Sequence, residues 1–220
     1  LIDRYLIGLS NNFGGGIVEW YKNFFIKKNY YQELKKSYLK GSNYFYFFPF
    51  IFGDRDMGFH QTSRGVFYGL GSNANVHDLT KSVLDSAGFS SKYLFNRISK
   101  DLNSRKISSV TLSGGLSRLD FLNKIKAQLF GIKTYICRDF ESTSLGCLML
   151  ILASQSKKNF DAPKIFENYF VKKELVAKEN EEKKSNATNK NYLKFNSFEK
   201  RSEQTKSGLK YIITFKGNGR

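Results

Sequence analysis

Two adjacent glycines, Gly114 and Gly115, follow a short apolar run from Ile107 to Leu112 and precede a helical pattern. The run is apolar and rich in β-branched residues, which is typical of a buried strand. Because glycine has no Cβ, a ligand can lie directly against the main chain of such a turn. Exposed N–H groups at the start of a helix bind phosphate. The arrangement predicts a nucleotide-contacting turn, and a plain tight turn is the other interpretation of the dipeptide.

The pattern after this turn predicts an amphipathic helix. Ser117 is expected to cap it, and Asp120, three residues later, would complete a capping box. Its apolar residues recur at helical spacing and form a stripe that is expected to be buried. This stripe consists of Leu119, Leu122, Ile125 and Leu129.

A second glycine loop, Gly14 to Gly16, repeats the same layout near the start of the chain. An apolar strand from Tyr5 to Leu9 precedes it, and a helix through Phe25 is expected to follow it. Two loops that join a strand to a helix through glycines indicate two anion-contacting turns in one domain.

The remaining pattern alternates helices and strands. We expect a helix over Tyr31 to Leu39 that ends at Gly41, a long helix capped by Asp78, and a last helix that begins among Ser142, Thr143 and Ser144. The expected strands are Tyr44 to Phe52, Arg64 to Leu70 and Ile132 to Cys137. This alternation predicts an α/β domain with helices packed on both faces of a mixed sheet.

Composition divides the chain after Ser154. The net charge is +17; residues 1–154 carry 20 Lys and Arg against 11 Asp and Glu, and residues 155–220 carry 16 against 8. We therefore expect a domain over 1–154 and a basic C-terminal extension over 155–220 that is partly helical or disordered. A basic tail can bind a polyanion. However, no zinc-knuckle, helix-turn-helix or Arg-rich pattern accompanies it, so nucleic acid is disfavoured as a partner.

The two cysteines, Cys137 and Cys147, lie in apolar segments without the spacing of a metal or redox motif, which favours a cytoplasmic location with reduced thiols. The longest apolar run, Tyr44 to Phe52, is too short to span a bilayer, so no membrane is expected as a partner. Because the chain opens on Leu1 instead of methionine, we expect a fragment or a processed product. A homodimer is left open.

Residues 65–85 carry a detailed motif: Gly65, Phe67, Gly69 and Leu70, then Asp78 and Leu79, and finally Ser82 to Asp85. This spacing resembles the C-terminal signature of the FGGY family of carbohydrate kinases, which includes glycerol, xylulose and gluconate kinases. Three further segments follow the family order. Pro49 to Gly65 is similar to its P-x-x-x-G-E-R loop, residues 112–118 to its G-G-x-x-R turn, and residues 141–153 to its T-x-L-G-A-A helix.

The resemblance implies an actin-like ATPase fold, also called ribonuclease-H-like, in which two domains close over an ATP cleft. This chain would be the second domain. Gly114 and Gly115 would approach the adenosine and α-phosphate of ATP, Gly15 would approach the phosphates, and Arg118 and Leu119 would flank the base. Many members carry Asn or Ser at the position of Leu119; because leucine cannot form that hydrogen bond, base selectivity is left open.

The family phosphorylates a sugar or polyol with ATP and Mg²⁺, and its catalytic aspartate lies in the N-terminal domain. No Asp-x-Gly-Thr motif occurs in this sequence, so we expect no catalytic residue here and no activity of the chain alone. No metal ligands are expected, because His60 and His77 have no third ligand at metal spacing. Two alternatives stay open: a non-catalytic actin-like binding or regulatory module, and a polyanion binder that acts through its basic tail.

Overall fold

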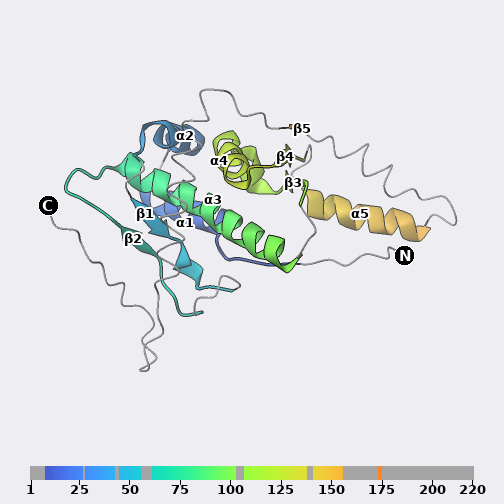
Figure 1. The fold of residues 1–220 in the computed structure, drawn as a ribbon. Helices are drawn as coiled ribbons and strands as arrows, with labels where there is room; N and C mark the ends of the chain where they lie inside the picture. Colours follow the sequence, from blue (N-terminus) through green and yellow to red (C-terminus); the bar gives the residue numbers. More distant parts are fainter. Residues whose placement is uncertain are drawn as a thin grey trace.

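In the computed structural model, long helices pack around short strands (Figure 1). The structure describes residues 8–26, 28–42, 45–55, 61–102, 107–137, 141–155 and 173–174. The helices are α1 (Gly15–Phe25), α2 (Tyr30–Lys40), η1 (Phe50–Phe52), α3 (Val76–Asp101), η2 (Gly115–Arg118), α4 (Asp120–Phe130) and α5 (Ser142–Gln155). The strands are β1 (Tyr46–Phe48), β2 (Val66–Tyr68), β3 (Ser109–Leu112), β4 (Lys133–Ile136) and β5 (Lys173–Glu174).

The described strands form two sheets. β3, β4 and β5 make a three-stranded mixed sheet, in which β4 runs parallel to β3 and antiparallel to β5. β1 and β2 pair antiparallel in a separate ribbon, with Phe47 opposite Phe67. The mixed sheet agrees with the expected architecture. It also includes two residues of the expected C-terminal extension, because β5 lies beyond residue 154.

Helix α3 is the central element of the packing and contacts α1, α2, α4 and β1. A helix begins where its first N–H groups find acceptors. The side chain of Asn75 accepts hydrogen bonds from the backbone of His77 and Asp78, and Asp78 in turn accepts one from the Asn75 amide. The prediction that Asp78 caps this helix was therefore wrong by three residues: Asn75 is the cap, and Asp78 completes the capping box.

The close packing of α3 on α4 depends on Gly88. A Cβ at this position would lie 2.6 Å from Ile125 Cγ2 and 3.0 Å from Leu129 Cδ1. Those distances are shorter than van der Waals contact, so only glycine lets the two helices approach this closely. The predicted stripe of α4 lies on this side, and Leu119, Leu122, Ile125 and Leu129 are all buried.

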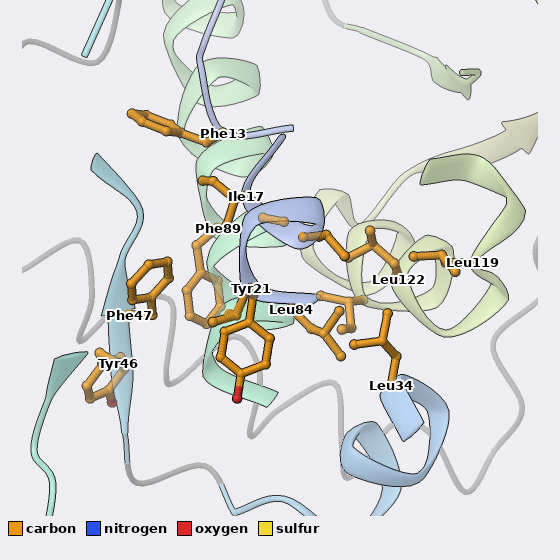
Figure 2. Packing of buried hydrophobic residues seen from close by; sticks show 14 of the residues in the cluster. Phe13, Ile17, Tyr21, Leu34, Tyr46, Phe47, Leu84, Phe89, Leu119 and Leu122 are labelled. Carbon is orange, nitrogen blue, oxygen red and sulfur yellow. The ribbon is translucent and has the colours of Figure 1, made fainter. Parts of the chain in front are cut away.

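The core joins α1, the β1–β2 ribbon and α3 through aromatic rings (Figure 2). Tyr21, Phe47 and Leu84 are each no more than 1% exposed. Trp20 stacks on Phe47 with ring centroids 6.0 Å apart. The hydroxyl of Tyr21 forms a 3.0 Å hydrogen bond with Thr80 Oγ1, which satisfies its polar group inside the core.

Two further predictions of local structure were wrong. Of the strand expected over Tyr44 to Phe52, only Tyr46–Phe48 forms a strand, β1. The chain turns at Pro49 into the short helix η1, which ends at Gly53, where φ is +71°. The helix expected to be capped by Ser117 begins instead at Asp120, after η2, and Leu119 at its N-cap position makes no side-chain cap. Ser117 and Asp120 therefore form no capping box.

Several other expectations hold. α1 and α2 begin and end within one or two residues of the predicted positions, the last helix begins where predicted, and β4 occupies the predicted strand. Asp85, the last residue of the 65–85 motif, is buried and pairs with Lys81 at 2.5 Å. The predicted strand Tyr5 to Leu9 lies largely outside the described residues, as do His60 and most of the extension.

Candidate functional site

The first wall of the candidate site is the start of α1. Gly14 is the N-cap residue and, having no side chain, it provides no side-chain cap for the first turn. Gly14, Gly15 and Gly16 are all exposed. The loop before them is fixed from both sides, because Asn12 donates to the Phe52 carbonyl at 3.0 Å and the Phe13 amide donates to Asn11 Oδ1 at 3.1 Å. An exposed helix N-terminus without a side-chain cap is suited to an anion.

The second wall is the turn between β3 and α4. Gly114 has a φ of +85° and a ψ of 175°, a conformation that is essentially restricted to glycine. The turn is closed by Ser117, whose amide and hydroxyl donate to the Gly114 carbonyl at 3.0 and 2.6 Å. The glycine therefore has a conformational role that does not depend on any ligand.

Asn123 holds the same turn from inside the protein. Its side chain is 1% exposed, and its Nδ2 donates a 2.7 Å hydrogen bond to the Ser117 carbonyl. The predictions from sequence missed this residue. The available signal was a lone amide beside Leu122, within an otherwise apolar stripe of α4.

The two walls lie near each other. A Cβ added to Gly15, at the start of α1, would come within 3.9 Å of Leu116 Cγ in η2, which is ordinary van der Waals distance. At Gly14, Gly114 and Gly115, no described atom lies within 4 Å of the position that a Cβ would take. Glycine is therefore not required at Gly14 or Gly115 by packing among the described residues, whereas open space beside both loops suits the close approach of a ligand.

The start of α5 forms a third side of the site. Ser142 donates to Ser113 Oγ at 3.1 Å, and Glu141 Oε1 lies 3.9 Å from Arg118 Nη2. Both members of this ion pair are more than 60% exposed, so it contributes little to stability. Both contacts join the turn after β3 to the start of α5, and Ser113, Glu141 and Ser142 were not among the predicted site residues.

Of the five predicted site residues, four are accessible and one is not. Gly15, Gly115 and Arg118 are exposed, and Gly114 is partly exposed. Leu119 is only 5% exposed and lies beside Leu122 in the core (Figure 2). Its side chain therefore packs inside the protein, and only its backbone is available to a ligand.

Three further polar side chains of the motif segments are His77, Asp54 and Arg64. His77 Nδ1 is 2.9 Å from Ser37 Oγ, so this histidine is tied to α2. Asp54 is 2% exposed, and Arg64 donates to the carbonyls of Thr62 and Ser63. Within the described ranges, no group of three or more His, Cys, Asp or Glu side chains is placed to hold a metal ion. No described helix is long and apolar enough to cross a membrane.

The arrangement of helices and mixed sheet is similar to that of solved sugar and polyol kinases. The xylulose kinase from Lactobacillus acidophilus superposes with a TM-score of 0.66 at 18% identity, over 85% of this chain and 38% of that one. The Plasmodium falciparum glycerol kinase with ADP superposes with a TM-score of 0.65 at 17% identity, over 88% and 38%. At this identity the likeness defines the fold, which is the actin-like ATPase fold.

Within the proteins of this fold, the sequence identifies one family. The model of the FGGY family of carbohydrate kinases, C-terminal domain, matches residues 3–154. The chain therefore belongs to this family. Residues 3–154 include both glycine turns and the signature segment between them.

Curated relatives agree with this assignment. The glycerol kinase of Shewanella sp. (strain ANA-3) is 26% identical over 149 residues, which are 67% of this chain and 30% of that protein. The glycerol kinase of Lactobacillus delbrueckii subsp. bulgaricus is 26% identical over 138 residues, or 62% and 27%. The chain thus spans less than two fifths of the length of each relative and each solved structure described here.

Proposed function

We propose that this chain is the C-terminal, nucleotide-binding half of an ATP-dependent carbohydrate kinase that transfers the γ-phosphate of ATP to a sugar or polyol hydroxyl. One observation carries the proposal. The two glycine turns lie near each other, since a Cβ added to Gly15 would come within 3.9 Å of Leu116 Cγ, and no described atom lies within 4 Å of a Cβ added to Gly14, Gly114 or Gly115. Two such turns side by side present backbone N–H groups to one elongated anionic ligand.

In this proposal each turn receives a different part of the nucleotide. The uncapped start of α1 takes the phosphates at Gly15, since the helix dipole favours negative charge there by about 0.3 to 1 kcal/mol. The turn at Gly114 and Gly115 takes the adenosine and the α-phosphate. The rigid hydrogen bonds of Ser117 favour binding, because a turn that is already ordered loses less conformational entropy.

Arg118 and Leu119 are proposed to flank the base in different ways. The exposed guanidinium of Arg118 can stack on an aromatic ring. Leu119 can contribute only its backbone, because its side chain is buried. Neither side chain supplies a selective hydrogen bond acceptor to adenine, so we expect weak discrimination between purine nucleotides.

The remaining parts of the reaction are assigned to protein outside this chain. Phosphoryl transfer requires a positioned base and a Mg²⁺ ion that bridges the phosphates. We propose that Mg²⁺ arrives with ATP, and that an N-terminal domain supplies the base and most contacts to the sugar. The proposal places the protein in the cytoplasm, where the thiols of Cys137 and Cys147 stay reduced.

Nucleotide binding tests the proposal directly. We expect the chain to bind ATP weakly and to show no sugar-dependent ADP release. We expect Gly115→Arg, which fills the open space beside the turn, to abolish ATP binding measured by calorimetry. Ser72→Arg, in the exposed turn before α3, is the control with the same added charge and should bind as the parent does. Sugar-dependent ADP release by the chain alone would contradict the proposal that the base and most sugar contacts lie outside this chain.

Two alternatives would give different results. A binding or regulatory module would lack the catalytic aspartate once the upstream coding sequence is recovered. A polyanion binder would lose affinity steeply with salt, as expected for released counterions, and would lose it altogether when residues 155–220 are deleted. The net charge of +17 favours testing this second alternative first.

A further inference from the structure

Two polar contacts bracket the turn formed by Gly114 and Gly115. Before the turn, Ser142 Oγ donates a 3.1 Å hydrogen bond to Ser113 Oγ. After the turn, Arg118 Nη2 lies 3.9 Å from Glu141 Oε1. Because the two partners at the start of α5 are consecutive in sequence, this short segment contacts the turn at both of its ends. The proposed function uses the guanidinium of this ion pair but gives no role to the carboxylate.

The carboxylate of Glu141 is accessible from solvent. Its side chain is 71% exposed, and that of Arg118 is 61% exposed. An exposed ion pair of this kind contributes little to stability. Between the two contacts lies Gly115, which is exposed and has no described atom within 4 Å of an added Cβ. Glu141 is therefore a hydrogen bond acceptor beside a turn that has room for a ligand.

The place of Glu141 along a bound nucleotide follows from the proposed function, on which this inference rests. There, Arg118 flanks the base and the turn at Gly115 takes the α-phosphate. Glu141 pairs with Arg118, and its neighbour Ser142 contacts the residue before the turn. Its carboxylate thus lies between the places assigned to the base and to the α-phosphate. The ribose of a nucleotide joins these two groups.

The chemistry of a carboxylate matches the ribose. The 2′ and 3′ hydroxyls are neighbouring O–H donors, and a carboxylate accepts hydrogen bonds through two oxygens. An acidic side chain binds a ribose hydroxyl in this way in dinucleotide-binding α/β domains. We propose that Glu141 accepts hydrogen bonds from the 2′ and 3′ hydroxyls of the bound nucleotide, and that it thereby selects ribonucleotides over deoxyribonucleotides.

The base is a weaker candidate for the same carboxylate. Adenine presents one donor, its 6-amino group, and ring nitrogens that act as acceptors lie on both sides of it. A carboxylate placed there accepts one hydrogen bond, while its second oxygen faces an acceptor. The ribose offers two neighbouring donors and is therefore the better match for Glu141.

Affinity ratios test the proposal on the unmodified chain. Ligand-observed NMR titrations, which suit weak complexes, compare ATP with 2′-deoxy-ATP and 3′-deoxy-ATP. We expect each deoxy analogue to bind roughly fivefold to tenfold more weakly than ATP, because it lacks one hydrogen bond to a charged acceptor. Equal binding of all three would overturn the ribose subsite and leave the proposed ATP site in place. A chain that binds none of them would contradict the proposed function, and the ribose subsite with it.

The substitution Glu141→Ala identifies the residue that recognises the ribose. Loss of its charge changes the affinity for the three equally charged ligands alike, so the ratios between them report the ribose contact alone. We expect the preference for ATP over both deoxy analogues to disappear. The matched control is Glu33→Ala on α2, since Glu33 is partly exposed and lies 3.8 Å from Lys36 Nζ in a similar ion pair. The control should keep the preference, and a preference that survives in Glu141→Ala would refute the assignment.

Two further measurements keep the test decisive. Folding of each variant is followed through the fluorescence of Trp20, the single tryptophan, which stacks on Phe47. If Glu141→Ala does not fold, Glu141→Gln keeps the side-chain volume and should still reduce the preference for ATP over the deoxy analogues. GTP is titrated as well. If Glu141 bound the base, its loss would change the ratio of ATP to GTP binding and leave the ratio of ATP to 2′-deoxy-ATP unchanged, and that result would overturn the proposal.

Discussion

Asn123 Nδ2 lies 2.7 Å from the carbonyl oxygen of Ser117, so a buried amide on α4 fixes the glycine turn that ends β3. The hydrogen bonds from Ser117 to Gly114 are local, and the bond between Ser142 and Ser113 lies at the exposed surface. The side-chain amide of Asn123 therefore links the turn between β3 and α4 to the core. The shape of this turn depends on α4 for that reason.

Replacing Asn123 tests that dependence. Asn123→Leu should lower the free energy of unfolding by about 1 to 3 kcal/mol, because the Ser117 carbonyl would lose its buried donor. It should also weaken ATP binding, since the turn is no longer held. Lys35→Ala, at an exposed position of α2, should change neither quantity. Urea denaturation and calorimetry measure the two effects.

Gly114 and Gly115 should respond differently to the same substitution. Gly114→Ala should cost about 1 to 3 kcal/mol of stability, because its φ of +85° is strained for alanine. Gly115→Ala should leave stability almost unchanged, because no described atom is within 4 Å of its added Cβ. If the proposed site is correct, Gly115→Ala nevertheless weakens ATP binding. A Gly115→Ala chain that is stable and binds ATP normally would remove Gly115 from the site.

Gly88 should be intolerant of any side chain. Gly88→Ala places a Cβ 2.6 Å from Ile125 Cγ2, and overpacking of this kind costs about 1 to 3 kcal/mol. In an Ile125→Ala background the penalty should shrink by about 1 kcal/mol, which a double-mutant cycle in urea measures. Gly146→Ala on α5, where no described atom is within 4 Å, is the control and should be neutral or stabilising.

Asp78 should make stability depend on pH. Burial by itself raises the pKa of this carboxyl, but hydrogen bonds from the amides of Ser42 and Asn75, at 2.7 and 3.0 Å, lower its pKa on balance. A lowered pKa in the folded state stabilises the protein above the unfolded value near 4, and that contribution is lost as the pH falls through the folded pKa.

The substitution Asp78→Asn isolates this contribution. At pH 7 it should lower the free energy of unfolding by about 1 kcal/mol, as loss of a capping interaction does. The difference from the parent chain should shrink toward pH 2. Asp101→Asn, at the exposed end of the same helix, should lack this dependence. A constant difference from pH 7 to pH 2 would show that Asp78 acts through packing instead of charge.

The sequence predicted best where burial alone decides the structure. The stripe of Leu122, Ile125 and Leu129 follows helical periodicity, and the structure buries all three. Both glycine turns were located, because a strand, a glycine pair and a helix are each local signals. The cap of α3 was predicted wrongly, since Asn75 and Asp78 are both residues that cap helices and only the geometry distinguishes them.

Predictions failed where residues distant in sequence act together. Ser117 resembles a helix cap, but its hydroxyl bonds back to Gly114 inside η2, so the helix starts later. Gly15 and Leu116 lie near each other although about 100 residues separate them in the sequence, and no local pattern predicts this proximity. The burial of Leu119 was predicted from its place in the stripe, but its consequence for a base contact follows only from the structure.

The pairing of β5 with β4 bears on how the protein can be shortened. The family match ends at residue 154, and a truncation there would remove Lys173 and Glu174. The amides and carbonyls of β4 that face β5 would then become an open strand edge, next to the exposed apolar surface of α5. Open edges recruit other chains. We therefore expect a chain cut at the family boundary to aggregate more readily than one that keeps the two residues of β5.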